Sequence, residues 1–212
     1  MKDTFVYSLG HVLTWLVSKI FFRLKSFGPG NVPAQGPVLI CSNHASYLDP
    51  IFIGSPVLQR QVAYLARDTL FRNRFFGWMI ERCHAYPVKR GAADLDAFRK
   101  ALWLLETGAA LVLFPEGTRT TDGALRPAKR GAGYLALKSG APVVPVYVKG
   151  SFEAWPKGRR SIRPRPVAVY FGEPFLFPQY SGQPVTRENT QAASDEIMKK
   201  IAELKQKSET SA

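Results

Sequence analysis

The stretch VLICSNHASYLDP, residues 38–50, begins with apolar residues and becomes more polar from Ser42 onward. Val38–Ser42 is a short apolar run, which predicts a buried strand, and the polar residues after it predict a loop that leads into a helix. Further apolar runs follow along the chain and alternate with segments of helical periodicity. This alternation predicts an α/β fold, with a single domain built on a mixed, largely parallel sheet flanked by helices.

The expected elements follow from the same periodicities. We predict six strands: Val38–Ser42, Val62–Ala66, Ala85–Lys89, Ala110–Phe114, Val143–Val148 and Val167–Phe171. We predict helices between and after them: Leu48–Pro56, Arg74–Arg82, Asp94–Glu106, Ala128–Ser139 and Arg187–Lys205. We therefore divide the 212 residues into an N-terminal helix at 1–26, a globular domain at 27–206 and a disordered tail at 207–212.

The N-terminal segment from Thr4 to Leu24 is rich in large apolar side chains. Its polar residues recur every three or four positions and therefore gather on one face of a helix. A bilayer crossing needs roughly 20 predominantly apolar residues, and His11 and Lys19 interrupt the only candidate window. We expect an amphipathic helix that lies in the membrane interface, with an ordinary core helix and a single span as the alternatives.

The charge of the chain is strongly positive. Lys and Arg number 29 against 16 Asp and Glu, which gives a formal net charge of +13. Such a balance favours an anionic partner, and nucleic acid, anionic lipid headgroups and phosphorylated substrates all qualify. The two cysteines, Cys41 and Cys83, lack metal-ligand spacing, and we expect both to be reduced.

His44 and Asp49 form a candidate catalytic pair. Ser46 and Asp49 have the spacing of a helix capping box, which places His44 just before a helix and Asp49 one turn inside it. A carboxylate that accepts from one imidazole nitrogen leaves the other free to act as a general base. A structural or capping role for His44 is the alternative. The sequence has no GxSxG elbow, so we expect a substrate hydroxyl to attack directly.

A second polar run, Phe114–Arg119 (FPEGTR), follows another apolar strand. Loops at such strand ends commonly build sites in α/β sheets. Gly117 permits close backbone approach, Thr118 offers a hydroxyl, and Arg119 can hold a phosphate through two hydrogen bonds. Glu116 can orient Arg119 or bind a glycerol hydroxyl. A tight turn with an exposed ion pair is the alternative.

Together the two runs carry a resemblance to a known family. The pattern Asn-His-x-Ser-x-x-Asp followed by Phe-Pro-Glu-Gly-Thr-Arg resembles the glycerolipid acyltransferases, of the 1-acylglycerol-3-phosphate type. Two weaker blocks, Ala85–Arg90 and Val143–Val148, are also similar. The resemblance covers about half of the chain and implies transfer of a fatty acyl group to the free hydroxyl of lysophosphatidic acid.

The resemblance also implies roles for individual residues. His44 would be the catalytic base and Asp49 its partner. The acyl acceptor would be bound by Lys89, Arg90, Glu116, Gly117, Thr118 and Arg119. Lys89 or backbone N–H groups near Gly117 would stabilise the oxyanion. The donor would be acyl-CoA or acyl-carrier protein as co-substrate, with no cofactor and no metal.

The same resemblance sets the expected partners and location. They are a membrane lipid substrate and an anionic membrane surface, with no nucleic acid, at the cytoplasmic face of the inner membrane. A basic stretch at 157–165 is predicted to be a loop, either solvated, facing a membrane, or contacting CoA phosphates or an acidic carrier. The alternatives are another lysophospholipid, a lyso-aminolipid or glycerol-3-phosphate as acceptor, or a non-catalytic basic membrane- or nucleic-acid-binding protein.

Overall fold

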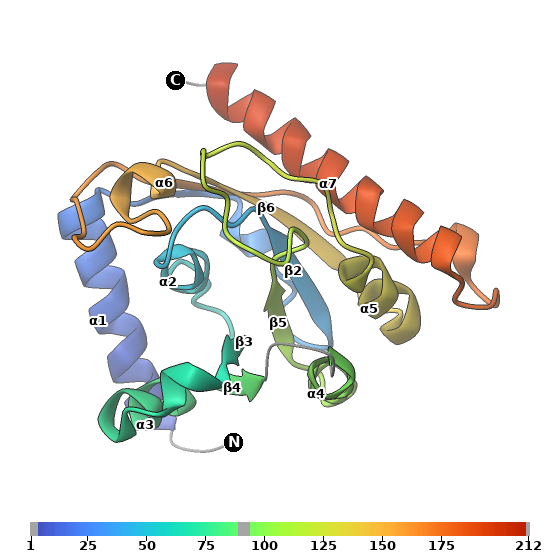
Figure 1. Cartoon of the computed structure of the whole chain (residues 1–212), viewed down its shortest axis with the longest axis horizontal. Coiled ribbons are helices and arrows are strands. Elements are labelled where there is room, and N and C mark those ends of the chain that lie inside the picture. The colour runs from blue at the N-terminus through green and yellow to red at the C-terminus, as the bar shows by residue number, and fades with distance from the viewer. Residues whose placement is uncertain (1–3, 89–93, 211–212) are drawn as a thin grey trace.

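The computed structural model describes residues 4–88 and 94–210, and within them a seven-stranded sheet forms the centre of the molecule (Figure 1). The strand order is β1-β7-β6-β2-β5-β3-β4. β6 and β7 pair antiparallel, and the other neighbours pair parallel. The strands are β1 (Lys25–Phe27), β2 (Val38–Ser42), β3 (Val62–Arg67), β4 (Ala85–Val88), β5 (Ala110–Leu113), β6 (Val143–Lys149) and β7 (Ala168–Phe171). The predicted α/β fold with a mixed, largely parallel sheet is confirmed.

Helices cover both faces of this sheet. They are α1 (Thr4–Phe22), α2 (Asp49–Gly54), α3 (Arg74–Arg82), α4 (Asp94–Glu106), α5 (Gly131–Ser139), α6 (Ser151–Ala154) and α7 (Arg187–Thr210). Strand β2 is buried along its whole length because its side chains alternate between two cores. Val38 and Ile40 pack in the core that also holds Phe52 of α2, whereas Leu39 and Cys41 pack in the core that holds residues of α4, α5 and α7.

Most predicted elements are present, with shifted ends. β2, α3 and α4 have the predicted bounds, whereas α2 is shorter than predicted and α5 begins at Gly131 rather than Ala128. β1 and α6 were not predicted, because segments of three and four residues carry no readable periodicity. The domain boundary drawn at residue 26 falls inside β1, and Phe22 and Leu24 belong to the core, so α1 joins the domain directly. Both cysteines are free, as expected.

The C-terminal helix is longer than predicted. α7 continues to Thr210, so the disordered tail expected from residue 207 is wrong for residues 207–210, and residues 211–212 lie outside the described residues. The end of the helix is attached to the sheet, because the Lys149 ammonium on β6 donates to the Ser208 carbonyl at 2.7 Å and Ser208 itself is buried. A tail composition of Ser, Thr and Lys does not reveal such a contact.

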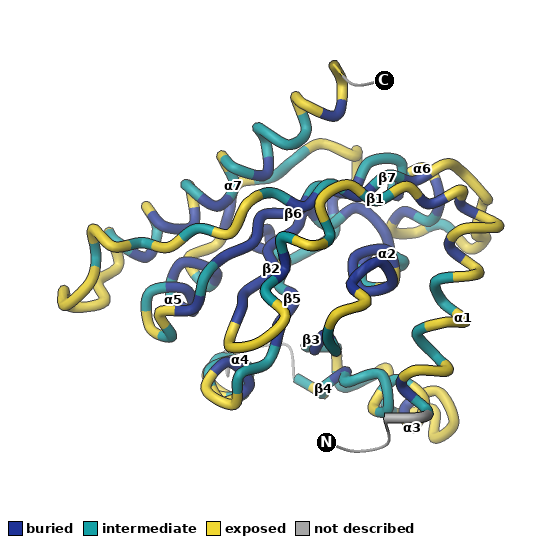
Figure 2. Tube along the Cα trace, turned by 180° about the vertical axis from the view of Figure 1, so that it is seen from behind, coloured by how far each residue is buried: buried dark blue, intermediate teal, exposed yellow. Residues whose placement is uncertain are grey.

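Helix α1 packs against the domain with its polar face. Tyr7 is buried with its hydroxyl accepting from the backbone N–H of Val62 at 3.1 Å, Ser18 is buried, and His11 Nε2 lies 2.9 Å from the carbonyl of Ser55. The apolar face points to solvent, as the exposed stretches of α1 in Figure 2 show. Its exposed side chains are Leu9, Val12, Leu13, Leu16, Val17, Ile20 and Phe21. Among the described residues, no helix has the length and hydropathy that a bilayer crossing requires.

Candidate active site

The two polar runs meet at one edge of the sheet. β2 pairs parallel with β5 and with β6, so the carboxyl ends of the three strands lie together. The loop after β2 carries His44, and the turn after β5 carries Glu116 to Arg119. Strand order therefore places the predicted base beside the predicted acceptor-binding turn.

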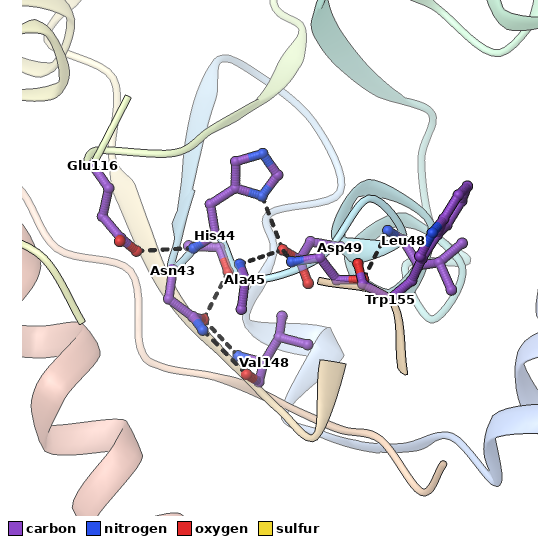
Figure 3. Close-up of polar contacts among 10 residues, drawn as sticks. Asn43, His44, Ala45, Leu48, Asp49, Glu116, Val148 and Trp155 are labelled. Carbon is purple, nitrogen blue, oxygen red and sulfur yellow. Dashed lines mark hydrogen bonds and ion pairs between the residues drawn. The ribbon is translucent and has the colours of Figure 1, made fainter. Parts of the chain in front are cut away.

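Asn43 fixes the point at which the loop leaves β2. Its side chain is buried and pairs with the backbone of Val148 on β6, donating to the carbonyl at 3.1 Å and accepting from the N–H at 2.8 Å (Figure 3). The amide thus continues the pairing of the two strands where β2 itself has ended. A buried polar group bonded on both sides has one low-energy position, so the next residue, His44, starts from a defined backbone.

His44 and Asp49 form the predicted pair. His44 Nδ1 lies 2.9 Å from Asp49 Oδ2, and the His44 side chain is 18% exposed while that of Asp49 is fully buried. The same Oδ2 accepts from the backbone N–H groups of Ala45 and Ser46, each at 2.7 Å. A carboxylate oxygen can only accept here, so Nδ1 carries the proton and Nε2 holds the free lone pair.

The ring is also held from its face. The imidazole stacks on Phe114 with centroids 3.8 Å apart and an angle of 14° between the planes. In Figure 3 its second nitrogen points away from the residues that hold the first one. Within the described part of the chain, no hydrogen bond engages Nε2. This nitrogen is available to take a proton from a substrate.

The predicted helix cap differs in detail. Asp49 is the first residue of α2, and its N-cap is Leu48, so Asp49 does not lie one turn inside the helix. Ser46 Oγ accepts from the Leu48 N–H at 3.2 Å and donates to the carbonyl of Trp155 at 3.0 Å. The capping-box spacing still has a consequence, because the Asp49 carboxylate reaches back to the Ser46 N–H.

Glu116 contacts the loop between β2 and α2 rather than Arg119. Its Oε1 accepts from the backbone N–H of His44 at 2.9 Å, and the side chain is buried. Burial raises the pKa of Glu116 to about 7, against the lowering effect of the His44 and Arg126 backbone N–H groups. The structure therefore makes Glu116 a positioning group for His44, and the predicted contact between Glu116 and the acceptor stays a prediction.

Gly117 closes the turn in a conformation that favours glycine. Its φ is +67°, and its N–H donates to the carbonyl of Phe114 at 2.9 Å, so this N–H is already engaged. A Cβ at this position would lie 2.9 Å from Cδ of Lys129. The Lys129 side chain thus lies across the turn and adds a cation to that of Arg119. The sequence did not predict this, because Lys129 lies ten residues after Arg119, just before helix α5.

Arg119 lies over the loop between β2 and α2. Its guanidinium stacks on the ring of Tyr47, with Cζ 3.4 Å from the centroid, and Tyr47 in turn packs on Trp155 at 4.8 Å. The N–H of Thr120, the next residue, donates to the carbonyl of His44 at 2.8 Å. Tyr47 and Trp155 were not predicted as site residues, since an aromatic side chain beside a motif usually packs in a core.

The structure thus brings His44, Asp49, Glu116, Gly117 and Arg119 together around one loop and one turn. Thr118 lies half-buried within that turn. Lys89 and Arg90, which were predicted to bind the acceptor, lie outside the described residues. Two surface hollows of about 340 and 320 Å³ lie between the segment after β7 and α7, and no residue named above lines either of them.

Comparison with known proteins identifies the family. Residues 23–149, more than half of the chain, match the model of the family described as Acyltransferase. The chain belongs to this acyltransferase family. Both runs that form the site, with His44 and Arg119, lie inside the matched residues.

Named relatives of this acyltransferase come from bacteria and plants. It is 29% identical over 184 residues to the 1-acyl-sn-glycerol-3-phosphate acyltransferase of Bacillus subtilis, covering 87% of this chain and 89% of the relative. It is 32% identical over 145 residues to a chloroplastic enzyme of that name from Brassica napus, covering 67% of this chain and 42% of the relative.

A solved structure is similar over most of the chain. The 1-acyl-sn-glycerophosphate acyltransferase of Thermotoga maritima superposes with a TM-score of 0.74 and 25% sequence identity, covering 94% of this chain and 81% of that one. The similarity therefore extends beyond the residues that the family model matches.

Proposed function

We propose that this acyltransferase moves a fatty acyl group from a thioester donor to the free hydroxyl of lysophosphatidic acid and so forms phosphatidic acid. The observation that carries the proposal is the His44 imidazole, fixed at Nδ1 by Asp49 and open at Nε2, beside a turn that presents Arg119. The acceptor fits the names of the relatives from Bacillus subtilis and Brassica napus.

His44 is the proposed general base. Nε2 removes the proton of the acceptor hydroxyl as the hydroxyl oxygen attacks the thioester carbonyl, and the imidazolium that forms is stabilised by the Asp49 carboxylate. The carbonyl oxygen becomes an oxyanion, and its collapse breaks the carbon–sulfur bond. The departing thiolate takes this proton from the His44 imidazolium, which returns His44 to its neutral form. A thiolate is a good leaving group, so the proposed step needs no metal or prosthetic group.

Arg119 is the proposed acceptor-binding cation. Its guanidinium is already oriented by stacking on Tyr47, which leaves its N–H donors directed along the plane of the group. A phosphate monoester can accept two of these bonds at once. Lys129, lying across Gly117, adds a second positive charge near the turn, for the phosphate or for the developing oxyanion.

The exposed face of α1 supports a location at a membrane surface. Its polar face is engaged with the domain, so the exposed apolar residues face away from the protein, where an acyl-chain layer would bury them. The irregular segment 155–166, which holds the basic stretch at 157–165, lies on the same side of the molecule as α1 (Figures 1 and 2). We place the enzyme peripherally at the cytoplasmic face, whose anionic lipids attract a chain of net charge +13.

An acceptor and donor panel tests the function. Purified protein is incubated with lysophosphatidic acid, a lysophospholipid that carries a headgroup, a lyso-aminolipid or glycerol-3-phosphate, each with acyl-CoA or acyl-carrier protein. Lipid products are measured by mass spectrometry. We expect phosphatidic acid from lysophosphatidic acid. Transfer to another acceptor alone would refute the proposed substrate, and no transfer to any acceptor would refute the enzymatic proposal.

A further inference from the structure

Helix α3 presents most of its apolar side chains to solvent. Of its nine residues, Gly77 is the buried one, whereas Phe75 is 74% exposed and Trp78 46% exposed. Phe76 and Met79 are also exposed, as is Leu70 in the 3₁₀ helix that precedes α3 (Asp68–Phe71). Exposed apolar residues are ordinary when scattered, but five within ten residues form a patch that marks an interaction site. We call these five residues the α3 patch.

The exposure is built into the local structure. The Asn73 side chain caps the helix by accepting from the Phe76 N–H at 3.0 Å. Gly77 lets the helix backbone approach Phe71 so closely that a Cβ there would lie 3.0 Å from the Phe71 backbone. α3 is therefore held by backbone contact through its glycine, and its aromatic side chains are left on the outer side, where Phe75 and Trp78 stack with centroids 6.2 Å apart.

Arginines flank the residues of the α3 patch in the sequence. Arg67, Arg72, Arg74 and Arg82 lie in the segment 67–82, which contains two acidic residues, Asp68 and Glu81. The Arg82 guanidinium lies 4.8 Å from the centroid of the Trp78 ring. An indole bordered by cationic groups suits the boundary between lipid headgroups and acyl chains, where the ring is half-buried and the guanidinium meets phosphates.

Helix α3 lies near the N-terminal end of helix α1. The residues just after α3 contact the N-terminal half of α1: the rings of His84 and Tyr7 lie 5.0 Å apart, and a Cβ on Gly10 would lie 3.5 Å from Cys83 Sγ. Figures 1 and 2 both show α3 beside the N-terminal end of α1, away from the helices that cover the opposite side of the sheet. Helix α3, which carries the patch, thus lies beside the N-terminal end of α1, which carries its own exposed apolar side chains.

We propose that the α3 patch is a second membrane contact, which inserts into an anionic bilayer beside α1 and fixes the orientation of the enzyme on it. This rests on the proposed function, because a lipid acceptor is what brings the protein to a bilayer. A single interfacial helix leaves the protein free to roll about the helix axis. A second contact beside its N-terminal end removes that freedom and holds the His44 loop at a constant height above the lipid surface.

Charge favours a bilayer over a second copy of the chain as the occupant. Two copies, each with a net charge of +13, repel one another, and the arginines that flank the α3 patch would face like charge across a dimer interface. An anionic lipid surface attracts the same arginines.

The test compares Phe75→Ser/Trp78→Ser with Leu176→Ser, an exposed apolar residue after β7 that serves as the matched control. Binding is measured by flotation with phosphatidylglycerol–phosphatidylcholine vesicles. Acyl transfer is measured with a short-chain, water-soluble lysophosphatidic acid and, separately, with long-chain lysophosphatidic acid in the vesicles. We expect the double variant to bind vesicles roughly tenfold more weakly or worse and to lose vesicle-borne transfer to a similar degree, with soluble-acceptor transfer unchanged. Unchanged vesicle binding would overturn the proposal.

A conservative variant keeps the test independent of folding. The spectral difference between the native protein and Trp78→Phe isolates the emission of Trp78, which should shift to the blue and be quenched by brominated acyl chains when vesicles are added. Trp78 emission that neither shifts nor is quenched when vesicles are added would contradict insertion. Lipid-free self-association that the double variant abolishes would assign the α3 patch to a second copy instead. Vesicle binding by the α3 patch without any transfer to lysophosphatidic acid would refute the proposed acceptor but not this surface.

Discussion

The loop between β2 and α2 and the exposed face of α1 differ in where their side chains find partners. In the loop, the partners are internal: Asp49 Oδ2 accepts three N–H donors, and His44 is bonded through its ring, its N–H and its carbonyl. On α1, Tyr7, His11 and Ser18 contact the domain, whereas seven large apolar side chains between Leu9 and Phe21 are exposed to solvent. We therefore expect the function of the loop to be sensitive to the loss of single hydrogen-bonding atoms. We expect the function of the exposed α1 face to depend on its total apolar area.

His44→Ala should have the largest effect, because it removes the proposed general base. We expect acyl transfer to fall ~10²- to 10⁴-fold, the usual loss for a general base, with the fold intact. Acyl-transfer rates measure the loss of activity, and circular dichroism measures whether the fold is intact. His11→Asn is the matched control, since His11 is a half-buried histidine on α1 whose ring bonds the carbonyl of Ser55, and it should keep transfer to a soluble acceptor. Full activity in His44→Ala would remove the loop from catalysis.

Arg119→Ala should weaken acceptor binding rather than the chemical step. A charge-assisted hydrogen bond contributes roughly 1.5 to 3 kcal/mol, so KM for lysophosphatidic acid should rise about tenfold to a hundredfold. Steady-state kinetics separate KM from kcat. Arg99→Ala, on the exposed surface of α4 beside Asp96, provides an arginine control outside the site. A KM that does not move would exclude Arg119 from the phosphate site.

The double variant Leu13→Ser/Ile20→Ser tests the exposed apolar face of α1. Leu13 and Ile20 are exposed on α1, so the substitutions cost the fold little but reduce the area offered to a bilayer. We expect about tenfold weaker binding to anionic vesicles, further weakened by raised salt, with soluble-acceptor transfer unchanged. Leu95→Ser on α4 is the exposed control. Equal binding by both variants would indicate that α1 does not meet the bilayer.

Glu116→Gln should have the smallest effect, and it concerns stability. The pKa of Glu116 is raised from 4.5 to about 7, so the folded state binds its proton more tightly than the unfolded state does. This contribution makes the native protein lose stability as pH rises from about 4.5 to about 7 and is constant above that range. Glu116→Gln has no group that titrates at this position. Between pH 5 and pH 8 its free energy of unfolding should therefore rise by on the order of 1 kcal/mol relative to that of the native protein, after a discount for solvent screening. Urea unfolding at both pH values measures the difference, and identical pH profiles would contradict the burial of a charge at Glu116.

The sequence predicted the parts of the site that depend on near neighbours in the chain. The spacing from His44 to Asp49 indicated the pair, which the structure confirms at 2.9 Å. The spacing did not indicate that Glu116 contacts the His44 N–H, because that contact depends on β5 lying next to β2 in the sheet. Tyr47 under Arg119 and Lys129 across Gly117 escaped prediction for the same reason.

The amphipathicity of α1 and the alternation of strands and helices are written in the order of residues, since periodicity reflects which side chains share a face. Which face meets the protein is a different matter. Tyr7 and Ser18 are buried against the domain, and the apolar face of α1 therefore points outward. This orientation depends on contacts that exist only once the sheet has formed, with the Ser55 carbonyl after α2 and the Val62 N–H of β3. Local patterns are fixed by neighbours in the chain, whereas long-range contacts are fixed by packing. The site and the exposed apolar surface of this acyltransferase need both.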